Sequence, residues 1–203
     1  MTLAETYNRI AEAWHRDHSN DDWWKEGTDT LLSMLPQQAT VLDVGCGSGV
    51  KAKYFLDRGL IVTGIDISEN LLTIARREAP AGTYQLLAME NLDSMQEQFD
   101  AVFAQASLLH IPKGNAEDVV GKMAARAKPN GFVYIAVKES RPGKPDEEIK
   151  KENDYGYDYE RPFTYFQMAE LEAYMGKAGL SVVWKEGKPS GKTVWLQIIA
   201  KRC

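Results

Sequence analysis

The chain has few cysteine and histidine residues: two cysteines, Cys46 and Cys203, and three histidines among 203 residues. Two cysteines cannot build a disulfide framework, and no Cys/His cluster has the spacing of a zinc site. His15 and His18 are near neighbours in the sequence, but this spacing fits two solvated side chains better than a metal site. The composition therefore predicts no metal centre.

Long apolar runs and an excess of positive charge are also absent. No run approaches the roughly 18 residues that a membrane-spanning helix needs. The N-terminal stretch, MTLAETYNRIAEAWHRDHSNDDWW, has no apolar core of a signal peptide, so we expect a cytoplasmic protein without a membrane partner. The 24 Lys and Arg residues against 29 Asp and Glu residues give a net charge of −5. A dedicated nucleic-acid binder normally carries a basic face, so a nucleic-acid partner is not expected.

The composition is that of an ordinary folded domain, with 44% hydrophobic and 26% charged residues. A chain of this length can bury one core, and we expect a single domain over residues 1–203. Residues 1–38 are expected to form an N-terminal helical cap, because Ala4, Tyr7, Ile10, Ala11 and Trp14 recur at helical spacing.

Apolar strand patterns alternate with helical patterns after this cap. Six helices are predicted, over residues 4–18, 28–35, 50–58, 68–79, 115–127 and 167–178. Seven strands are predicted, over residues 39–44, 60–67, 83–88, 99–106, 131–138, 180–186 and 193–201. This alternation predicts an α/β fold with a doubly wound, mostly parallel seven-stranded sheet of Rossmann-like type. The last two strands predict a C-terminal antiparallel hairpin at or near an edge.

Two polar segments interrupt this alternation of helices and strands. Lys128-Pro129-Asn130-Gly131 predicts a turn before the fifth strand. Residues 139–163 are polar and rich in Pro, Gly and Tyr, and we expect them to form a long lid loop. In a doubly wound sheet the ligand binds beyond the carboxyl ends of the strands, at the switch point of the strand order.

The segment Val41-Leu42-Asp43-Val44-Gly45-Cys46-Gly47-Ser48-Gly49 is the most informative part of the sequence. Glycines after a buried strand permit a tight turn and a close approach of ligand to backbone. Asp66 follows Gly45 by 21 residues, at the end of the next strand, where a carboxylate can accept hydrogen bonds from ribose hydroxyls. A nicotinamide dinucleotide fits less well: Val50 occupies the sixth position of G-x-G-x-x-G/A, and Asp43 suits a cationic amino group better than a pyrophosphate.

Together these residues resemble the class I S-adenosylmethionine-dependent methyltransferases. VLDVGCGSG is followed by Asp66 in TGIDIS, as in that family. Three further segments resemble the family in order, namely QFDAVFAQASLLHIP (98–112), AKPNGFVYIAVK (127–138) and FTYFQMAELEAYMGKAGL (163–180). The resemblance spans about Tyr7 to Lys201. It implies S-adenosylmethionine as cofactor, S-adenosylhomocysteine as product and methyl transfer by in-line displacement without a metal.

The resemblance also implies a set of cofactor contacts around the glycine turn. The backbone of Gly45, Cys46 and Gly47 would line the methionine moiety, whose ammonium would lie near Asp43 and the carbonyl of Ala104. Asp66 would bind the ribose, and Ile67, Met89 and Glu90 would contact the adenine. Tyr7 would close over the cofactor. Two positions depart from the family pattern. Ala88 stands where an Asp often bonds the adenine amine, and Asn130 replaces the second glycine of K-P-G-G.

His110 is the candidate catalytic residue, because it follows the fourth strand at the mouth of the expected cleft. It could accept a proton from an acceptor hydroxyl or amine; a packing or backbone-bonding role is equally open. Trp14, Arg161 and Tyr165 are candidate acceptor-binding residues in two aromatic-rich segments. For Trp14 a role as core anchor of the cap stays open, and for Arg161 a surface ion pair.

The predicted function is methyl transfer to a small-molecule acceptor. The compact chain leaves no room for a dedicated macromolecule-binding domain. Two alternatives stay open: methylation of an RNA or protein side chain, and a protein that binds S-adenosylmethionine without transferring its methyl group. A nicotinamide-dependent oxidoreductase is the weakest of the alternatives.

Overall fold

A seven-stranded sheet forms the centre of the protein. A computed structural model describes residues 1–203, and its strand order is β3-β2-β1-β4-β5-β9-β8. The strands are β1 (Thr40–Val44), β2 (Ile61–Asp66), β3 (Thr83–Leu86), β4 (Phe99–Gln105), β5 (Ala127–Lys138), β8 (Leu180–Ser190) and β9 (Thr193–Arg202). Strands β1 to β5 are parallel, whereas β9 pairs antiparallel with both β5 and β8. The predicted α/β fold with its C-terminal antiparallel hairpin is confirmed.

The helices begin and end close to their predicted positions. They are α1 (Leu3–His18), α2 (Lys25–Met34), α3 (Val50–Leu56), α4 (Glu69–Glu78), α5 (Lys113–Arg126) and α6 (Met168–Lys177), with 3-10 helices η1 (Met89–Ser94) and η2 (Leu108–His110). Ser68 caps α4 as predicted, because its hydroxyl accepts from the Leu71 amide at 3.2 Å. No helix is both long enough and apolar enough to span a bilayer.

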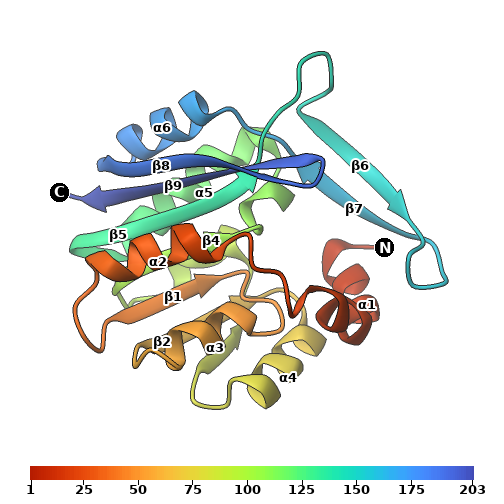
Figure 1. The fold of residues 1–203 in the computed structure, drawn as a ribbon, viewed down its shortest axis with the longest axis horizontal. Coiled ribbons are helices and arrows are strands. Elements are labelled where there is room, and N and C mark those ends of the chain that lie inside the picture. The colour runs from red at the N-terminus through yellow and green to blue at the C-terminus, as the bar shows by residue number, and fades with distance from the viewer.

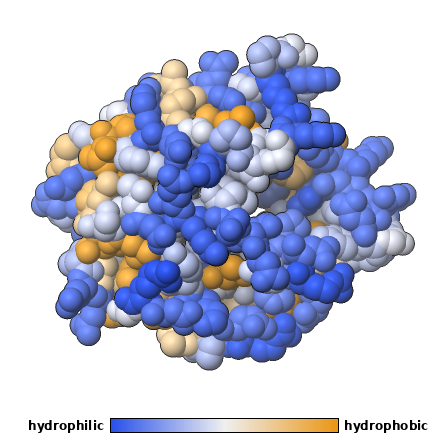
Figure 2. Space-filling model, in the orientation of Figure 1, coloured by the Kyte–Doolittle hydropathy of each residue, from blue (hydrophilic) through white to orange (hydrophobic).

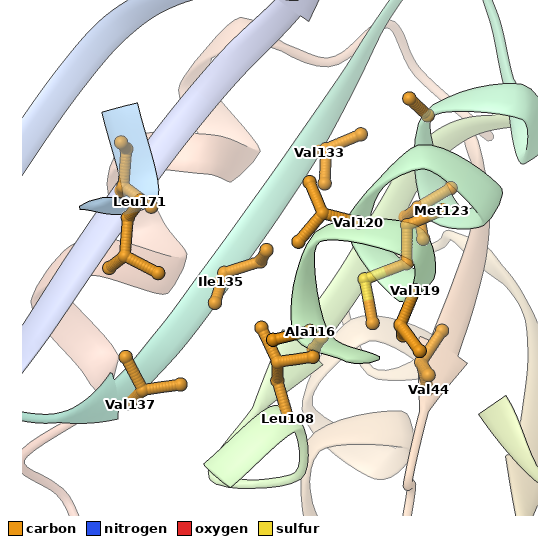
Figure 3. Close-up of a cluster of buried hydrophobic side chains, with 14 of the residues drawn as sticks. Val44, Leu108, Ala116, Val119, Val120, Met123, Val133, Ile135, Val137 and Leu171 are labelled. Carbon is orange, nitrogen blue, oxygen red and sulfur yellow. The ribbon is translucent and has the colours of Figure 1, made fainter. Parts of the chain in front are cut away.

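Neighbouring residues of the central strands enter two different cores. Val41 contacts the core beneath α2, α3 and α4, where Phe103 stacks on Tyr134 with centroids 4.5 Å apart. Leu42 and Val102 contact the opposite core, beneath α5 and α6. Figure 3 shows the valines and Ile135 of β5 pointing toward the apolar side chains of α5 in this second core. Because both faces are covered, the strands are almost continuously apolar.

The direction of the chain across the sheet changes at β1. Strand β2 follows on one side of β1 and β4 returns on the other side, so the switch point lies between β1 and β4. In Figure 1 the arrows of β1 and β5 point toward the side that holds α1 and a separate hairpin, while the arrow of β9 points away. The carboxyl ends of the parallel strands are therefore covered by elements outside the sheet.

The predicted N-terminal cap divides into two parts with different roles. Helix α1 packs Ala11 against Leu71 and Ile74 of α4, at the carboxyl end of the sheet. Helix α2 instead covers the sheet itself, because its fully buried Leu31 joins the core of Val41. Of these two helices, α1 is therefore the one that lies where it can cover a ligand at the switch point.

The segment expected to be a lid loop is largely a β-hairpin. Strands β6 (Glu147–Glu152) and β7 (Tyr159–Thr164) pair antiparallel over six residues each. Five of the six residues of β6 are charged, so the sequence shows no apolar alternation that would predict this strand. The hairpin contacts α1, where the Thr6 hydroxyl donates to the Glu160 carbonyl at 3.2 Å. Figure 2 shows hydrophilic side chains over the end of the molecule where α1 and the hairpin lie.

The turn predicted at residues 128–131 lies inside β5 rather than before it. Pairing with β4 passes from Phe99–Ala127 to Ala101–Phe132, so these residues form an irregularity within one strand. Asn130 has a positive φ of 64° there, and its side chain is exposed. Asn tolerates this left-handed conformation better than most side chains, which accounts for an asparagine at this position.

Asn130 therefore provides a test of this backbone geometry. Asn130→Val should lower the free energy of unfolding by about 1–2 kcal/mol, because a branched side chain is strained in the left-handed region. Asn130→Gly should retain or slightly raise stability. Urea denaturation of the two variants checks this expectation. Equal stability of the Val and Gly variants would contradict the positive φ.

Candidate active site

The glycine turn after β1 brings the backbone to the carboxyl ends of β1 and β4. The Gly45 and Cys46 amides both donate to the Ile65 carbonyl, at 2.8 and 2.9 Å. Gly45 has a φ of 73°, and a Cβ there would lie 2.4 Å from the Cβ of Ser107. Glycine is therefore required for both conformation and space. Gly47 has a φ of 54°, so its peptide also adopts a conformation that disfavours other residues.

Two buried carboxylates flank this turn. Asp66 accepts from the Gly47 amide with Oδ2 and from the Ser68 amide with Oδ1, both at 2.9 Å. Asp43 is 2% exposed, and its Oδ2 has no hydrogen-bond partner. Burial raises the pKa of both carboxyl groups above the ordinary value for aspartate. A cationic or hydroxyl-bearing ligand would supply what these carboxylates lack.

Gln105 and Lys51 are site residues that the sequence analysis did not identify. Gln105 is 6% exposed at the end of β4, and neither its amide nitrogen nor its amide oxygen has a partner. A polar residue at the end of the apolar strand FDAVFAQA was the available signal. Lys51 lies in the first turn of α3 and lines the same cavity. Burial lowers the pKa of Lys51, while Asp43 and Asp21 oppose this shift.

A cavity of about 390 Å³ joins these groups, a volume within the range of about 300–1,000 Å³ found for small-molecule sites. The predicted site residues that line it are Tyr7, Trp14, Asp43, Gly45, Cys46, Gly47, Asp66, Ile67, Met89, Glu90, His110 and Arg161. They come from α1, the β1 and β2 ends, η1, η2 and β7. The fold therefore brings most of the predicted site together.

Two predicted residues do not line the cavity. Ala104 is fully buried and faces the core beneath α5, because residues alternate between the two faces of β4. Its neighbour Gln105 reaches the cavity instead. Tyr165 belongs to the same core, and its hydroxyl donates to Glu148. Neither residue is placed to contact a ligand through its side chain.

Hydrogen bonds determine the tautomer of His110, and burial keeps its ring neutral. Its Nδ1 lies 2.7 Å from the Pro162 carbonyl, which can only accept, so Nδ1 carries the proton. Its Nε2 then accepts from the Tyr7 hydroxyl at 2.8 Å. Burial lowers the pKa of His110 to about 4, and the nearby Arg161 and Lys138 charges add to this effect. The imidazole is therefore neutral at pH 7, with its lone pair directed at a hydroxyl that lines the cavity.

Arg161 connects this pair to the hairpin. Its guanidinium donates to both Glu152 carboxylate oxygens, at 2.6 and 2.7 Å, and to the Tyr7 oxygen at 3.3 Å. Burial would lower the pKa of Arg161, but these hydrogen bonds raise it above its ordinary value. Both side chains of the ion pair are largely buried. The charge of Arg161 is thus already balanced by Glu152. This favours an ion pair over acceptor binding as the role of Arg161, but the ion pair is largely buried and does not lie on the surface, where the sequence analysis had considered it.

The histidines of α1 form separate contacts. His15 Nδ1 lies 2.9 Å from the Ser48 hydroxyl, and His18 Nδ1 lies 2.9 Å from the Trp14 carbonyl. The Trp14 ring stacks on His18 with centroids 4.6 Å apart and lies against Gly47. No group of three or more His, Cys, Asp or Glu side chains is arranged to hold a metal ion.

Comparison with known proteins identifies the family. Residues 41–131, from β1 into β5, match the methyltransferase domain family. A ubiquinone biosynthesis O-methyltransferase of Coxiella burnetii (strain RSA 331 / Henzerling II) is 30% identical over 154 residues, which cover 67% of this chain and 65% of that protein. The chain thus spans just under two thirds of the length of this relative.

Solved structures share the fold over nearly the whole chain. A 1,6-didemethyltoxoflavin-N1-methyltransferase of Burkholderia thailandensis matches with a TM-score of 0.78 and 20% identity, over 98% of this chain and 87% of that chain. A magnesium protoporphyrin IX methyltransferase of Synechocystis PCC 6803 matches with a TM-score of 0.76 and 16% identity, over 99% and 95%. Fold and glycine turn together define a Rossmann-like methyltransferase domain. The chain belongs to the class I S-adenosylmethionine-dependent methyltransferases, and the predicted resemblance is confirmed.

The lowered pKa of His110 can be tested by an NMR titration. Nitrogen-15 NMR of the imidazoles should show one histidine that stays neutral, with its proton on Nδ1, down to a pH near 4. Its pKa is lowered because burial penalises the charged ring. His110→Gln should remove this resonance pattern. A His110 signal that titrates near the ordinary value of about 6.5 would contradict the buried arrangement.

Proposed function

We propose that the protein binds S-adenosylmethionine at the switch point and transfers its methyl group to a small-molecule acceptor. The observation that carries this proposal is the pair of unpartnered buried groups, Asp43 Oδ2 and the Gln105 amide, beside the glycine turn. Buried polar atoms are normally hydrogen-bonded, so two such groups in one cavity indicate a polar ligand.

The residues present fit the chemical groups of this cofactor. Asp43 has a free carboxylate oxygen for an α-ammonium, and Lys51 has an ammonium for an α-carboxylate. Each Asp66 oxygen has one backbone donor, which leaves lone pairs for two ribose hydroxyls. Ile67 and Met89 offer apolar surface for a flat base, with Glu90 beside them. We also propose that Gln105 takes the position near the ammonium that the resemblance assigned to Ala104.

Bound S-adenosylmethionine supplies an already activated methyl group, so the protein mainly has to align the acceptor and exclude water. Tyr7 of α1 covers the cavity from one side, and Arg161 and Phe163 of β7 cover it from another. The hairpin and α1 are joined through Tyr7, Arg161 and the Thr6 hydroxyl. We therefore propose that α1 and the β6–β7 hairpin act together as the lid.

His110 is the proposed proton acceptor. Its Nε2 lone pair faces the Tyr7 hydroxyl, so a proton from the acceptor can reach Nε2 through this hydroxyl or by displacing it. A base with a pKa of about 4 is weak. However, an acceptor hydroxyl becomes strongly acidic as its oxygen forms the new bond, and such a base can take the proton at that stage.

The named relatives support a small acceptor. Their names specify ubiquinone biosynthesis, 1,6-didemethyltoxoflavin and magnesium protoporphyrin IX. These substrates differ widely, so they support the size class of the acceptor and not its identity. A cytoplasmic location and the absence of a nucleic-acid partner stay predictions from the sequence.

Cofactor binding can be measured by calorimetric titration with S-adenosylhomocysteine, with NAD as the specificity control. We expect one site per chain, and at least about tenfold weaker binding in Asp66→Ala, because hydrogen bonds to a charged group are lost. Asp57→Ala, which removes an exposed carboxylate of α3's C-terminal end, should bind normally. Stronger binding of NAD than of S-adenosylhomocysteine would refute the proposed cofactor.

The role of His110 is tested by separating turnover from binding. His110→Ala should lower methyl transfer by about 10²–10⁴-fold, the usual contribution of a general base, and should leave S-adenosylhomocysteine affinity nearly unchanged. Transfer of labelled methyl groups is measured into separate small-molecule, tRNA and protein fractions. Normal turnover in the variant would exclude His110 as the base. Label appearing in tRNA or protein would favour a macromolecular acceptor.

A further inference from the structure

Lys138, the last residue of β5, is a cation without a partner inside the cavity. Its side chain lines the cavity and forms neither an ion pair nor a hydrogen bond. The Nζ atom lies 4.1 Å from the ring centroid of Phe163 and 5.5 Å from that of Trp195. Aromatic faces stabilise an ammonium only modestly and do not neutralise its charge.

The carboxylates near Lys138 are already engaged elsewhere. Glu152 accepts two hydrogen bonds from Arg161. Glu148 accepts from the Tyr165 hydroxyl and lies 3.5 Å from the Lys150 ammonium. Burial lowers the pKa of Lys138 to about 8, and the positive charges of Lys150 and Arg161 contribute to this shift. His110 is neutral and therefore contributes no charge near Lys138. Glu152 and Glu148 oppose this shift but form no bond to Lys138, so Lys138 has no carboxylate partner of its own.

The opposite end of the cavity has the reverse charge character. Asp43, Asp66 and Glu90 line that end, and Lys51 there is faced by Asp43 and Asp21. This acidic end is the proposed binding place of the cationic cofactor. The end near Lys138 is therefore available to a second ligand with the opposite charge.

Apolar rings form the walls around Lys138. Trp23 stacks on Trp195 with centroids 3.9 Å apart and planes inclined by 13°, and both rings line the cavity together with Phe163. Flat aromatic walls favour a flat, apolar ligand body. The matched methyltransferase domain segment ends at residue 131, so Lys138, Phe163 and Trp195 lie outside the part shared with the family at large.

We propose that the methyl acceptor carries an anionic oxygen, as a carboxylate or an ionised hydroxyl, that pairs with the Lys138 ammonium while an apolar part of the acceptor packs against the aromatic walls of the cavity. A charge-assisted hydrogen bond in this partly dehydrated place is stronger than one on the surface. The inference rests on the proposed function, which places the cofactor at the acidic end of the cavity and identifies this anion as the methyl acceptor.

Calorimetric titration of the protein loaded with S-adenosylhomocysteine tests the anion preference with matched probes. 2-Naphthoate is compared with 2-naphthamide, and 4-nitrophenol above its pKa with 4-nitroanisole, so the two sources of anionic oxygen are distinguished. In at least one pair the anion should bind about tenfold or more tightly than its neutral counterpart, as expected for one charge-assisted hydrogen bond.

Variants assign this preference to one side chain. Lys138→Met should abolish the difference within each pair, and Lys138→Arg should retain most of it. Lys151→Met is the matched control, because it removes a hairpin lysine whose side chain is 84% exposed and outside this cavity. Its preference should equal that of the unaltered protein. Equal binding of anion and neutral probe, or no binding of either anion, overturns the inference. Loss of S-adenosylhomocysteine binding instead overturns the proposed function.

Thermal stability separates ligand recognition from a structural role. An unpartnered half-buried ammonium destabilises the folded state, so Lys138→Met should raise Tm at pH 7. Because the pKa of Lys138 in the folded protein is lowered to about 8, this destabilisation is complete below about pH 8. The destabilisation should then decrease as the pH rises toward about 10.4, the ordinary pKa of lysine in the unfolded chain. A lower Tm for Lys138→Met at pH 7 would instead indicate that the side chain serves the fold and would count against the inference.

Discussion

The close approach of Gly45 to Ser107 is the constraint on which the site depends. The ends of β1 and β4 separate at the switch point, yet the Ser107 hydroxyl donates to the Val44 carbonyl at 2.6 Å and holds them together. No side chain fits at Gly45 against Ser107. This contact keeps the glycine turn beside β4, so that the unpartnered groups of Asp43 and Gln105 face one cavity rather than two separate strand ends.

Electrostatic balance within the cavity is set by residues that are far apart in the sequence. Glu152 neutralises Arg161, whereas Lys138 is left without a carboxylate. The acids at the β1 and β2 ends give the other half of the cavity the opposite character. Such an arrangement costs stability, because partly buried charges without partners are unfavourable. Ionisable groups with such perturbed pKa values cluster at functional sites.

Helix α1, the β6–β7 hairpin and η2 are joined over the cavity by a continuous series of hydrogen bonds. Arg161 of β7 donates to Tyr7 of α1, and Tyr7 donates to His110 of η2, whose other nitrogen bonds the Pro162 carbonyl. Movement of the hairpin would therefore disturb the hydrogen bonds of His110 as well as access to the cavity. In the proposed function, ligand binding and proton transfer to His110 would be coupled through these same few contacts.

Local patterns in the sequence were sufficient for the seven strands of the sheet, the Ser68 cap, the glycine turn and the place of Asp66 at the end of β2. Each depends on neighbours within a few residues, or on the period of buried side chains. The β6–β7 hairpin was missed because its charged residues follow no apolar alternation. The carbonyl of Ala104 stays a prediction, whereas the Gln105 side chain was missed, since only the pleat of β4 in its sheet decides which of two adjacent side chains faces the cavity.

The sequence by itself determined the α/β class, the family and the acidic half of the site, because these follow from short-range spacing and from residue types that few other structures require. The tertiary structure alone decided the partners of charged groups. Arg161 has Glu152, His110 has Tyr7 and Pro162, and Lys138 has none. Ion pairs and pKa values depend on distances and burial in space, and neither is encoded in the local order of residues.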